Sequence, residues 1–154
     1  MEIRKMNGRI YITDTDLQKL RRLIAGLRAA RSPEVEHLDM LEQELDRAEV
    51  VASEAIPCDV VTMNSEVRMQ DLDSGSIQRY KLVFPAQFRW DFSVSVLAPI
   101  GTAMLGYRVG DVIEWPVPRG TRRLKVEEVI YQPEAAGLID DEVHQAAGAK
   151  SLGN

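Results

Sequence analysis

Side chains that could carry out chemistry are few in this sequence and stand far apart. His37 and His144 lie in different kinds of segment, and neither has a second histidine or a cysteine at the spacing of a zinc site. Cys58 is the only cysteine, and no motif pairs it, or any serine, with a base that would activate a nucleophile. A glycine-rich phosphate loop is also missing. We therefore expect neither an autonomous enzyme nor a metal or cofactor site.

The most informative stretch spans residues 96–111, has the sequence VLAPIGTAMLGYRVGD and contains no catalytic side chain. Pro99 fixes one backbone angle, while Gly101 and Gly106 permit turns that other residues resist. Between the two glycines, residues 103–105 are apolar and can bury one short helical turn against a sheet. This pattern is typical of a docking element rather than of an active site.

Composition excludes several classes of function. A chain of 154 residues is long enough for one good core, with or without a small appendage, and too short for two enzymatic domains. The net charge of -5 disfavours direct binding to nucleic acid, which requires clustered lysine and arginine. The single cysteine fits a reducing cytoplasm, and we interpret Cys58 as a small apolar residue at the entrance of a strand. No segment is apolar enough to span a bilayer, so we expect a cytoplasmic protein without membrane contacts.

Two helices are predicted in the first third of the chain. Thr13 can cap a helix that begins near Asp14, and Ser32 with Pro33 ends this helix and starts a second one. The apolar stripe of the first helix consists of Leu17, Leu20, Ile24 and Leu27. The stripe of the second consists of Leu38, Leu41, Leu45 and Ala48. Two stripes of similar length joined by a tight connection predict a short antiparallel hairpin of coiled-coil type.

The two arms of this predicted hairpin carry opposite charge. Residues 14–31 hold five basic and two acidic side chains, a net charge of +3. Residues 34–52 hold seven acidic side chains and one arginine, a net charge of -6. We expect the arms to attract each other, although charge on helix faces is usually solvated and this pattern alone assigns no function.

A sheet is predicted from residue 57 onward, where alternation of apolar and polar residues replaces the helical spacing. The alternating positions are Val67 and Met69, then Tyr80, Leu82 and Phe84, then Ile113, Trp115 and Val117, and finally Leu124 and Val126. Turn residues at 73–75 and 118–120 separate these runs and predict hairpins. The apolar pattern changes face after Val126, which predicts a bulge near Glu127. We expect an antiparallel sheet with one short helix.

The fold class that follows is α+β, in three sequence units. Residues 1–54 form the helical hairpin, and the boundary lies between Ser53 and Pro57. Residues 55–138 form the sheet unit, and residues 139–154, which are polar and lack a sustained period, form a flexible tail.

Long ordered strings in this chain resemble a known family. These are ELDRAEV at residues 44–50, PCDVVTMNSEVRMQDLDSG at 57–75, APIGTAMLGYRVGD at 98–111 and YQPEAAG at 131–137. They are similar to the GreA/GreB family of bacterial transcription factors, and especially to its small Rnk group, the regulators of nucleoside diphosphate kinase. The resemblance implies a helical hairpin followed by an FKBP-like domain, and a small partner of RNA polymerase that is not an enzyme.

The resemblance also implies a docking site. In Gre-type factors a proline-containing loop ahead of the short helix contacts a coiled coil at the rim of the polymerase secondary channel, and that proline matches Pro99. The polymerase-binding candidates are therefore Leu97, Ala98, Pro99, Ile100 and Gly101. Cleavage factors tend to have an acidic or polar residue just before this proline, whereas here Leu97 and Ala98 predict a more apolar contact. The simpler alternative is that Pro99 and Gly101 only shape a turn.

The hairpin tip leaves a second function open. Glu34, Glu36 and Asp39 lie near the tip, where cleavage factors of the Gre family place acidic residues that help to hold a metal ion in the polymerase active centre. Carboxylates suit magnesium, which prefers hard oxygen ligands. The family's tip pattern of an acid, leucine, serine, glutamate and asparagine is missing here, however, and a hairpin of about 18 residues per arm reaches only about 27 Å. Helix capping is the simpler role for Glu34 and Glu36.

A third candidate function is prolyl isomerase or peptide-binding activity, which FKBP-like domains often have. Phe88, Trp90 and Phe92 alternate and are expected to share one strand face, but core packing explains them more simply than a ligand groove. The motifs that line the pocket of true isomerases are not recognisable.

Taken with this resemblance, the sequence predicts a monomeric, non-enzymatic regulator that binds RNA polymerase near the secondary channel. It would compete there with longer coiled-coil factors and act by occupying the entrance. The group it resembles implies an effect on nucleoside diphosphate kinase levels, and no residue indicates a direct contact with that enzyme.

Overall fold

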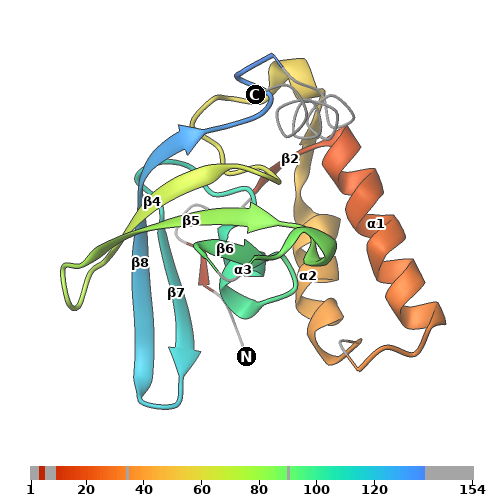
Figure 1. Ribbon diagram of the computed structural model, residues 1–154, viewed down its shortest axis with the longest axis horizontal. Coiled ribbons are helices and arrows are strands. Elements are labelled where there is room, and N and C mark those ends of the chain that lie inside the picture. The colour runs from red at the N-terminus through yellow and green to blue at the C-terminus, as the bar shows by residue number, and fades with distance from the viewer. Residues whose placement is uncertain (1–3, 6–9, 34, 90, 138–154) are drawn as a thin grey trace.

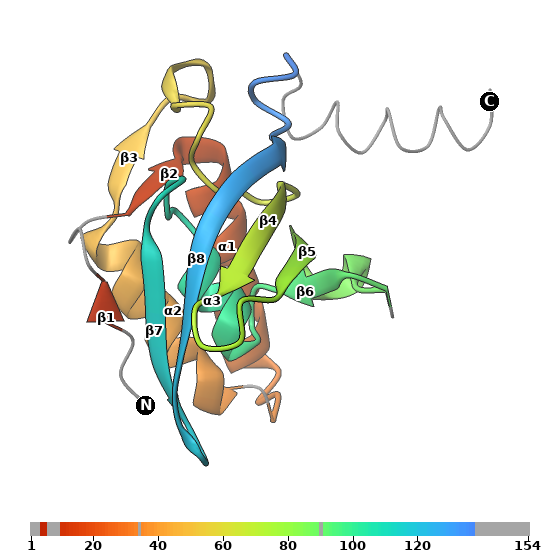
Figure 2. The ribbon, with the colours of Figure 1, turned by 90° about the vertical axis from the view of Figure 1, so that its left-hand side faces the viewer.

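The computed structural model describes residues 4–5, 10–33, 35–89 and 91–137, and Figure 1 shows their arrangement. The helices are α1 Asp14–Ala29, α2 Val35–Arg47 and α3 Pro99–Met104, with short 3-10 turns η1 Ser53–Ala55 and η2 Pro85–Gln87. The strands are β1 Arg4–Lys5, β2 Tyr11–Thr13, β3 Glu49–Val51, β4 Glu66–Asp71, β5 Ile77–Val83, β6 Ser93–Ser95, β7 Val112–Val117 and β8 Gly120–Tyr131. The α1–α2 hairpin lies along one side of a curved sheet, which confirms the α+β class (Figures 1 and 2).

The main sheet has six strands in the order β1-β7-β8-β4-β5-β6. All neighbours are antiparallel except β5 and β6, which are parallel because the chain crosses through η2 before it pairs again. The prediction of a purely antiparallel sheet was therefore wrong at this edge. The two predicted hairpins are confirmed: β4 and β5 flank the turn at residues 73–75, and β7 and β8 are joined through Pro118 and Arg119.

The predicted bulge lies on β8. Val67 pairs with Val129 and Arg68 with Glu128, but Met69 pairs with Val126, so Glu127 is the extra residue. A second register shift follows between Glu66 and Val67. The bulges keep Leu124 and Val126 on the buried face while β8 bends along the sheet.

Helix α1 begins where its sequence predicts. The side chain of Thr13 accepts a hydrogen bond from the backbone N–H of Asp16, at 3.1 Å, and so caps the helix. Asp16 is itself buried, and its Oδ2 accepts a hydrogen bond from the backbone N–H of Met63 at 3.1 Å. The start of the hairpin is thus tied directly to the sheet unit.

The second helix is shorter than its apolar pattern predicts. It ends at Arg47, and residues 49–51, expected to continue the helical arm, form strand β3 instead. β3 pairs with β2 in parallel, with Tyr11 opposite Glu49, so the hairpin is closed at its base by a small two-stranded sheet. Sequence periodicity missed this pair because its two strands stand more than 30 residues apart.

Ion pairs join the two arms, as their opposite charges predict. Arg21 contacts Asp46 at 2.8 Å, and Arg28 contacts Asp39 at 2.9 Å and Glu42 at 2.8 Å. These pairs lie on the surface, where water screens them, so they set the register of the arms more than they stabilise the fold.

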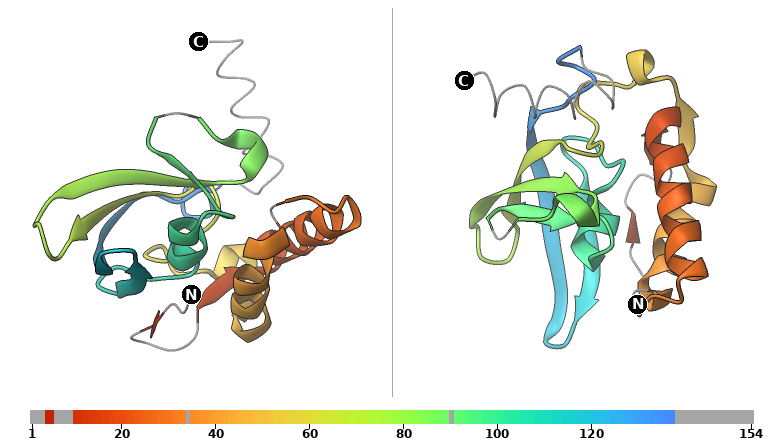
Figure 3. Two further views of the ribbon diagram at one scale, coloured as in Figure 1. Left: turned by 90° about the horizontal axis from the view of Figure 1, so that it is seen from below. Right: turned by 45° about the vertical axis from the view of Figure 1, so that its right-hand side comes forward.

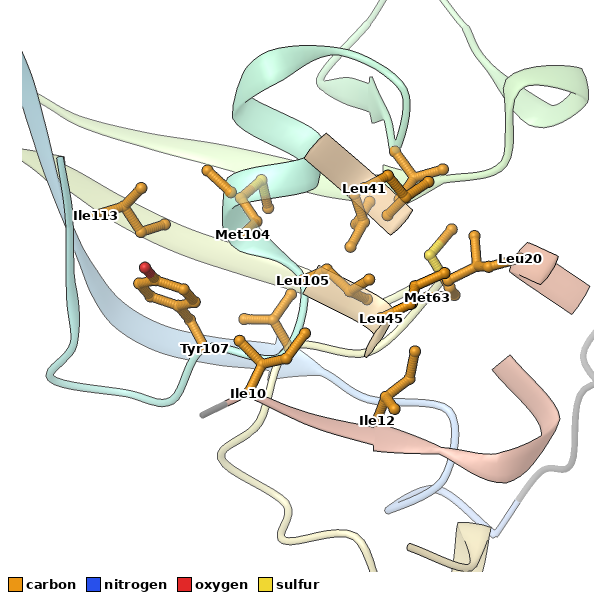
Figure 4. Close-up of a cluster of buried hydrophobic side chains, with 14 of the residues drawn as sticks. Ile10, Ile12, Leu20, Leu41, Leu45, Met63, Met104, Leu105, Tyr107 and Ile113 are labelled. Carbon is orange, nitrogen blue, oxygen red and sulfur yellow. The ribbon is translucent and has the colours of Figure 1, made fainter. Parts of the chain in front are cut away.

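One apolar core joins the hairpin to the sheet. Figure 4 shows side chains from both arms meeting side chains from the sheet unit and from the end of α3. The largest fully buried side chains are Ile10, Ile12, Leu20, Leu38, Leu41, Leu45, Met63, Met69, Leu82, Met104, Leu105 and Ile113. The sequence boundary between Ser53 and Pro57, near η1, stays a prediction, and the tail from residue 139 lies outside the described residues.

Two further observations concern single residues and membrane contact. Cys58 is exposed in a turn, so its interpretation as an apolar residue at a strand entrance was wrong. Within the part of the chain that the structure describes, no helix is long and apolar enough to cross a membrane.

Gly101 provides a test of how tightly α3 is seated. A Cβ atom at this position would overlap the carbonyl oxygen of Ser95, so we expect Gly101→Ala to lower the free energy of unfolding by about 1 to 3 kcal/mol. An added Cβ at Gly26 in α1 would have no atom within 4 Å. We therefore expect Gly26→Ala to raise the free energy of unfolding by about 0.5 to 1 kcal/mol. Urea unfolding measures both. Equal stability of the two variants would contradict the close approach.

Candidate docking site

Residues 97–101, which lead into α3 and include its first residues, form the candidate docking loop. Several hydrogen bonds hold this loop in place. The backbone N–H of Ala98 donates to the carbonyl of Ser95 at 3.0 Å, and that of Leu97 donates to Ser95 Oγ at 3.2 Å. Thr102 Oγ1 donates to the carbonyl of Val96 at 2.7 Å from within the core. Pro99 occupies the first position of α3, where its missing N–H costs nothing. The loop therefore presents one fixed conformation.

Burial divides the five predicted contact residues into two sets. Leu97 is only 7% exposed and belongs to the core, and Gly101 is buried against Ser95. Ala98, Pro99 and Ile100 are half-buried, and the side chain of Ile100 also packs against the core. The structure thus brings the five residues together in one loop, but only Ala98, Pro99 and Ile100 offer surface to a partner.

The end of α3 is anchored on the hairpin side. Gly106 has a φ of +80°, and a Cβ there would overlap the side chain of Ile10. Its N–H donates to the carbonyl of Val61 at 2.9 Å, while its own carbonyl accepts from Tyr11 at 3.4 Å. Tyr107 follows in the core, and burial raises the pKa of its hydroxyl. Helix α3 also contacts α2, and Figure 3 shows the two helices side by side from two directions. This contact fixes the orientation of the loop relative to the hairpin.

At the hairpin tip only one of the three predicted acids has a described side chain. Asp39 is 78% exposed, and its carboxylate binds Arg28, which also binds Glu42. The hydrogen bond to Glu42 raises the pKa of Arg28. The side chains of Glu34 and Glu36 lie outside the described residues.

The structure gives no support to a metal centre at the residues it describes. Among them, no group of three histidine, cysteine or acidic side chains is placed to hold an ion. The side chain of His37 and the whole of His144 lie outside this part of the chain.

The aromatic triplet does not form a strand face. Phe88 follows η2, Phe92 lies in a bend before β6, and Trp90 lies outside the described residues, so the expected shared face was wrong. The ring of Phe92 lies 4.1 Å from the guanidinium carbon of Arg79 on the neighbouring strand. This stacked pair explains Phe92 without a ligand.

A pocket and an ion pair between distant segments are among the features that sequence reasoning missed. A pocket of about 270 Å³ lies between α1 and η2, and it is lined by Lys19, Arg22, Phe84, Ala86 and Gln87. Arg108 binds both carboxylate oxygens of Asp59, at 3.2 and 3.1 Å, which raises the pKa of Arg108. Both features join segments far apart in the sequence, so no local pattern signals them.

Two family models match the chain in succession. Residues 9–51 match the Rnk N-terminus, and residues 56–131 match the C-terminal part of the transcription elongation factors GreA/GreB. The second match contains the whole docking loop and α3. Three of the four strings on which the sequence resemblance was based lie inside these matches, and the fourth, at residues 131–137, overlaps the second match only at Tyr131.

Individual proteins agree with these models. The regulator of nucleoside diphosphate kinase from Escherichia coli K12 is 43% identical over 130 residues, which cover 83% of this chain and 93% of that protein. GreA from Clostridium botulinum is 33% identical over 90 residues, 58% of this chain and 56% of its own length. A GreA/GreB elongation factor structure from Nitrosomonas europaea is 41% identical with a TM-score of 0.67, covering 81% of this chain and all of that one. The protein belongs to the GreA/GreB transcription factor family and, within it, to the regulators of nucleoside diphosphate kinase.

Proposed function

We propose that this protein is a non-enzymatic transcription regulator that binds RNA polymerase at the rim of the secondary channel and competes there with Gre-type factors. In this proposal it acts as a monomer, with a short coiled-coil hairpin and an FKBP-like sheet unit. Its relatives are transcription elongation factors and regulators by name, which supports polymerase as the partner. An effect on nucleoside diphosphate kinase would then arise through transcription.

The observation that carries the proposal is the preformed docking loop. Ala98, Pro99 and Ile100 are the accessible residues of a loop whose backbone is fixed by hydrogen bonds to Ser95 and Val96. A rigid apolar contact loses little conformational entropy on binding, so even a small surface can contribute strongly. The loop also lies inside the segment that matches the GreA/GreB family.

The hairpin dimensions favour competition by occupancy. Helix α1 has 16 residues and α2 has 13, which correspond to lengths of about 24 and 20 Å. Because the hairpin shares its core with the sheet and contacts α3, its direction is fixed once the loop has docked. Such a body fills the channel entrance while its tip stays close to that entrance.

The tip supports occupancy better than transcript cleavage. The carboxylate of Asp39 is engaged by Arg28, which also holds Glu42, so this acid serves the contact between the arms. Cleavage stimulation requires carboxylates that are free to coordinate a metal ion in the polymerase active centre. Isomerase activity is likewise less supported, since Phe92 is stacked on Arg79.

Substitution of Pro99 tests the docking loop. An aspartate at the first position of α3 is compatible with the helix start but places a charge in the apolar contact. We expect Pro99→Asp to weaken binding to core RNA polymerase by about tenfold or more. It should also lose the ability to displace a Gre-type factor in a competition titration.

Pro118→Asp, in the exposed turn between β7 and β8, is the matched control and should bind like the wild type. Failure of the wild-type protein to bind polymerase would refute the proposal, and equal losses for the two variants would refute the role of the loop.

The acids of the tip separate occupancy from cleavage. A variant with Glu34→Ala, Glu36→Ala and Asp39→Ala should bind polymerase within about twofold of the wild type, because Glu42 still holds Arg28 across the arms. Neither protein should accelerate RNA cleavage in stalled elongation complexes. Cleavage that is stimulated by the wild type and lost in the triple variant would establish the alternative function.

A further inference from the structure

A second candidate binding site lies where the hairpin faces the connection between β5 and β6. The pocket has a volume of about 270 Å³, near the lower end of the range for ligand sites. Lys19 and Arg22 come from α1, whereas Phe84, Ala86 and Gln87 belong to the segment around η2, drawn in green beside the helices in Figure 1. Among the described residues, none of those that line it is acidic.

The two cations are placed side by side by the helix. Lys19 and Arg22 stand three positions apart, a spacing that puts them on one face of α1. The Nε of Arg22 donates to the carbonyl of Gln18 at 3.5 Å. Within the described part of the chain, Arg22 forms no ion pair with a carboxylate, unlike Arg21 and Arg28 on the same helix. Its charge is therefore available to a ligand.

The opposite wall supplies an apolar surface and an oriented amide. Phe84 is half-buried and packs against the core, and Ala86 beside it is exposed. The Oε1 of Gln87 accepts a hydrogen bond from the backbone N–H of Phe84 at 3.3 Å, which fixes this side chain at the edge of the pocket. Its amide nitrogen can then donate to an oxygen of a ligand.

We propose that this pocket binds an acidic peptide segment that carries an apolar side chain. The apolar side chain lies against Phe84 and Ala86, and the flanking carboxylates bind Lys19, Arg22 and the amide of Gln87. The residues that line this pocket differ from Ala98, Pro99 and Ile100, and the inference does not depend on polymerase binding.

A carboxylate fits this site better than the phosphate of a nucleotide. Phosphate sites commonly use backbone N–H groups at the start of a helix or in a glycine-rich loop. Here both cations come from beyond the first turn of α1, and so from beyond the N–H groups at the helix start. Separate carboxylates on a flexible peptide can pair with the two cations without such a set of backbone N–H groups.

Fluorescence anisotropy with a labelled peptide of sequence Asp-Asp-Phe-Asp-Asp tests the proposal on the full-length protein. We expect saturable binding that weakens as salt is raised, and at least tenfold weaker binding when the four aspartates are replaced by asparagine. Arg22→Glu and Ala86→Glu should each weaken binding by about tenfold, since each brings a negative charge to the pocket. Both positions are exposed, and thermal unfolding followed by circular dichroism verifies that the variants fold.

Arg119→Glu is the matched control, because it makes the same charge change in the exposed turn between β7 and β8. It should alter peptide binding by less than about twofold. No saturable binding of the acidic peptide would overturn the proposal, as would equal binding of the asparagine peptide or equal losses in Arg22→Glu and Arg119→Glu. Binding of adenosine monophosphate, lost in Arg22→Glu while the peptide does not bind, would identify a nucleotide site instead.

Discussion

Burial of apolar side chains between the hairpin and the sheet is the interaction on which the other features depend. Leu41 and Leu45 of α2 share one core with Met104 and Leu105 at the end of α3. Truncating one buried leucine typically costs about 2 to 5 kcal/mol, far more than a surface ion pair contributes. The core therefore fixes the position of the hairpin relative to the docking loop, and the ion pairs between the arms only refine its register.

A fixed hairpin changes how a short factor can work. A mobile arm would sample many directions, and only a few of them would enter a channel beside the docking surface. Here β2 and β3 close the base of the hairpin, and the buried carboxylate of Asp16 ties its first turn to Met63. In the proposed function, binding at the loop would therefore determine where the tip lies, and occupancy of the channel would need no further rearrangement.

Sequence patterns predicted the features that depend on neighbouring residues and missed the contacts between segments far apart in the chain. The cap at Thr13 and the bulge at Glu127 follow from neighbouring residues, and both are confirmed. Strand β3 was missed because it pairs with β2 across the whole hairpin. The burial of Leu97 and the pocket beside Arg22 also arise only when separate segments pack together. The family resemblance identified the loop, and the structure was needed to separate its accessible residues from its buried ones.

The most direct test of the docking model is a map of contacts in the complex with core RNA polymerase. A photoreactive amino acid in place of Ala98 should cross-link to polymerase residues at the rim of the secondary channel, because Ala98 is accessible beside Pro99. The same reagent in place of Arg119 should not cross-link there. Cross-links from position 98 to a site remote from the channel, or cross-links to the rim only from position 119, would contradict the model.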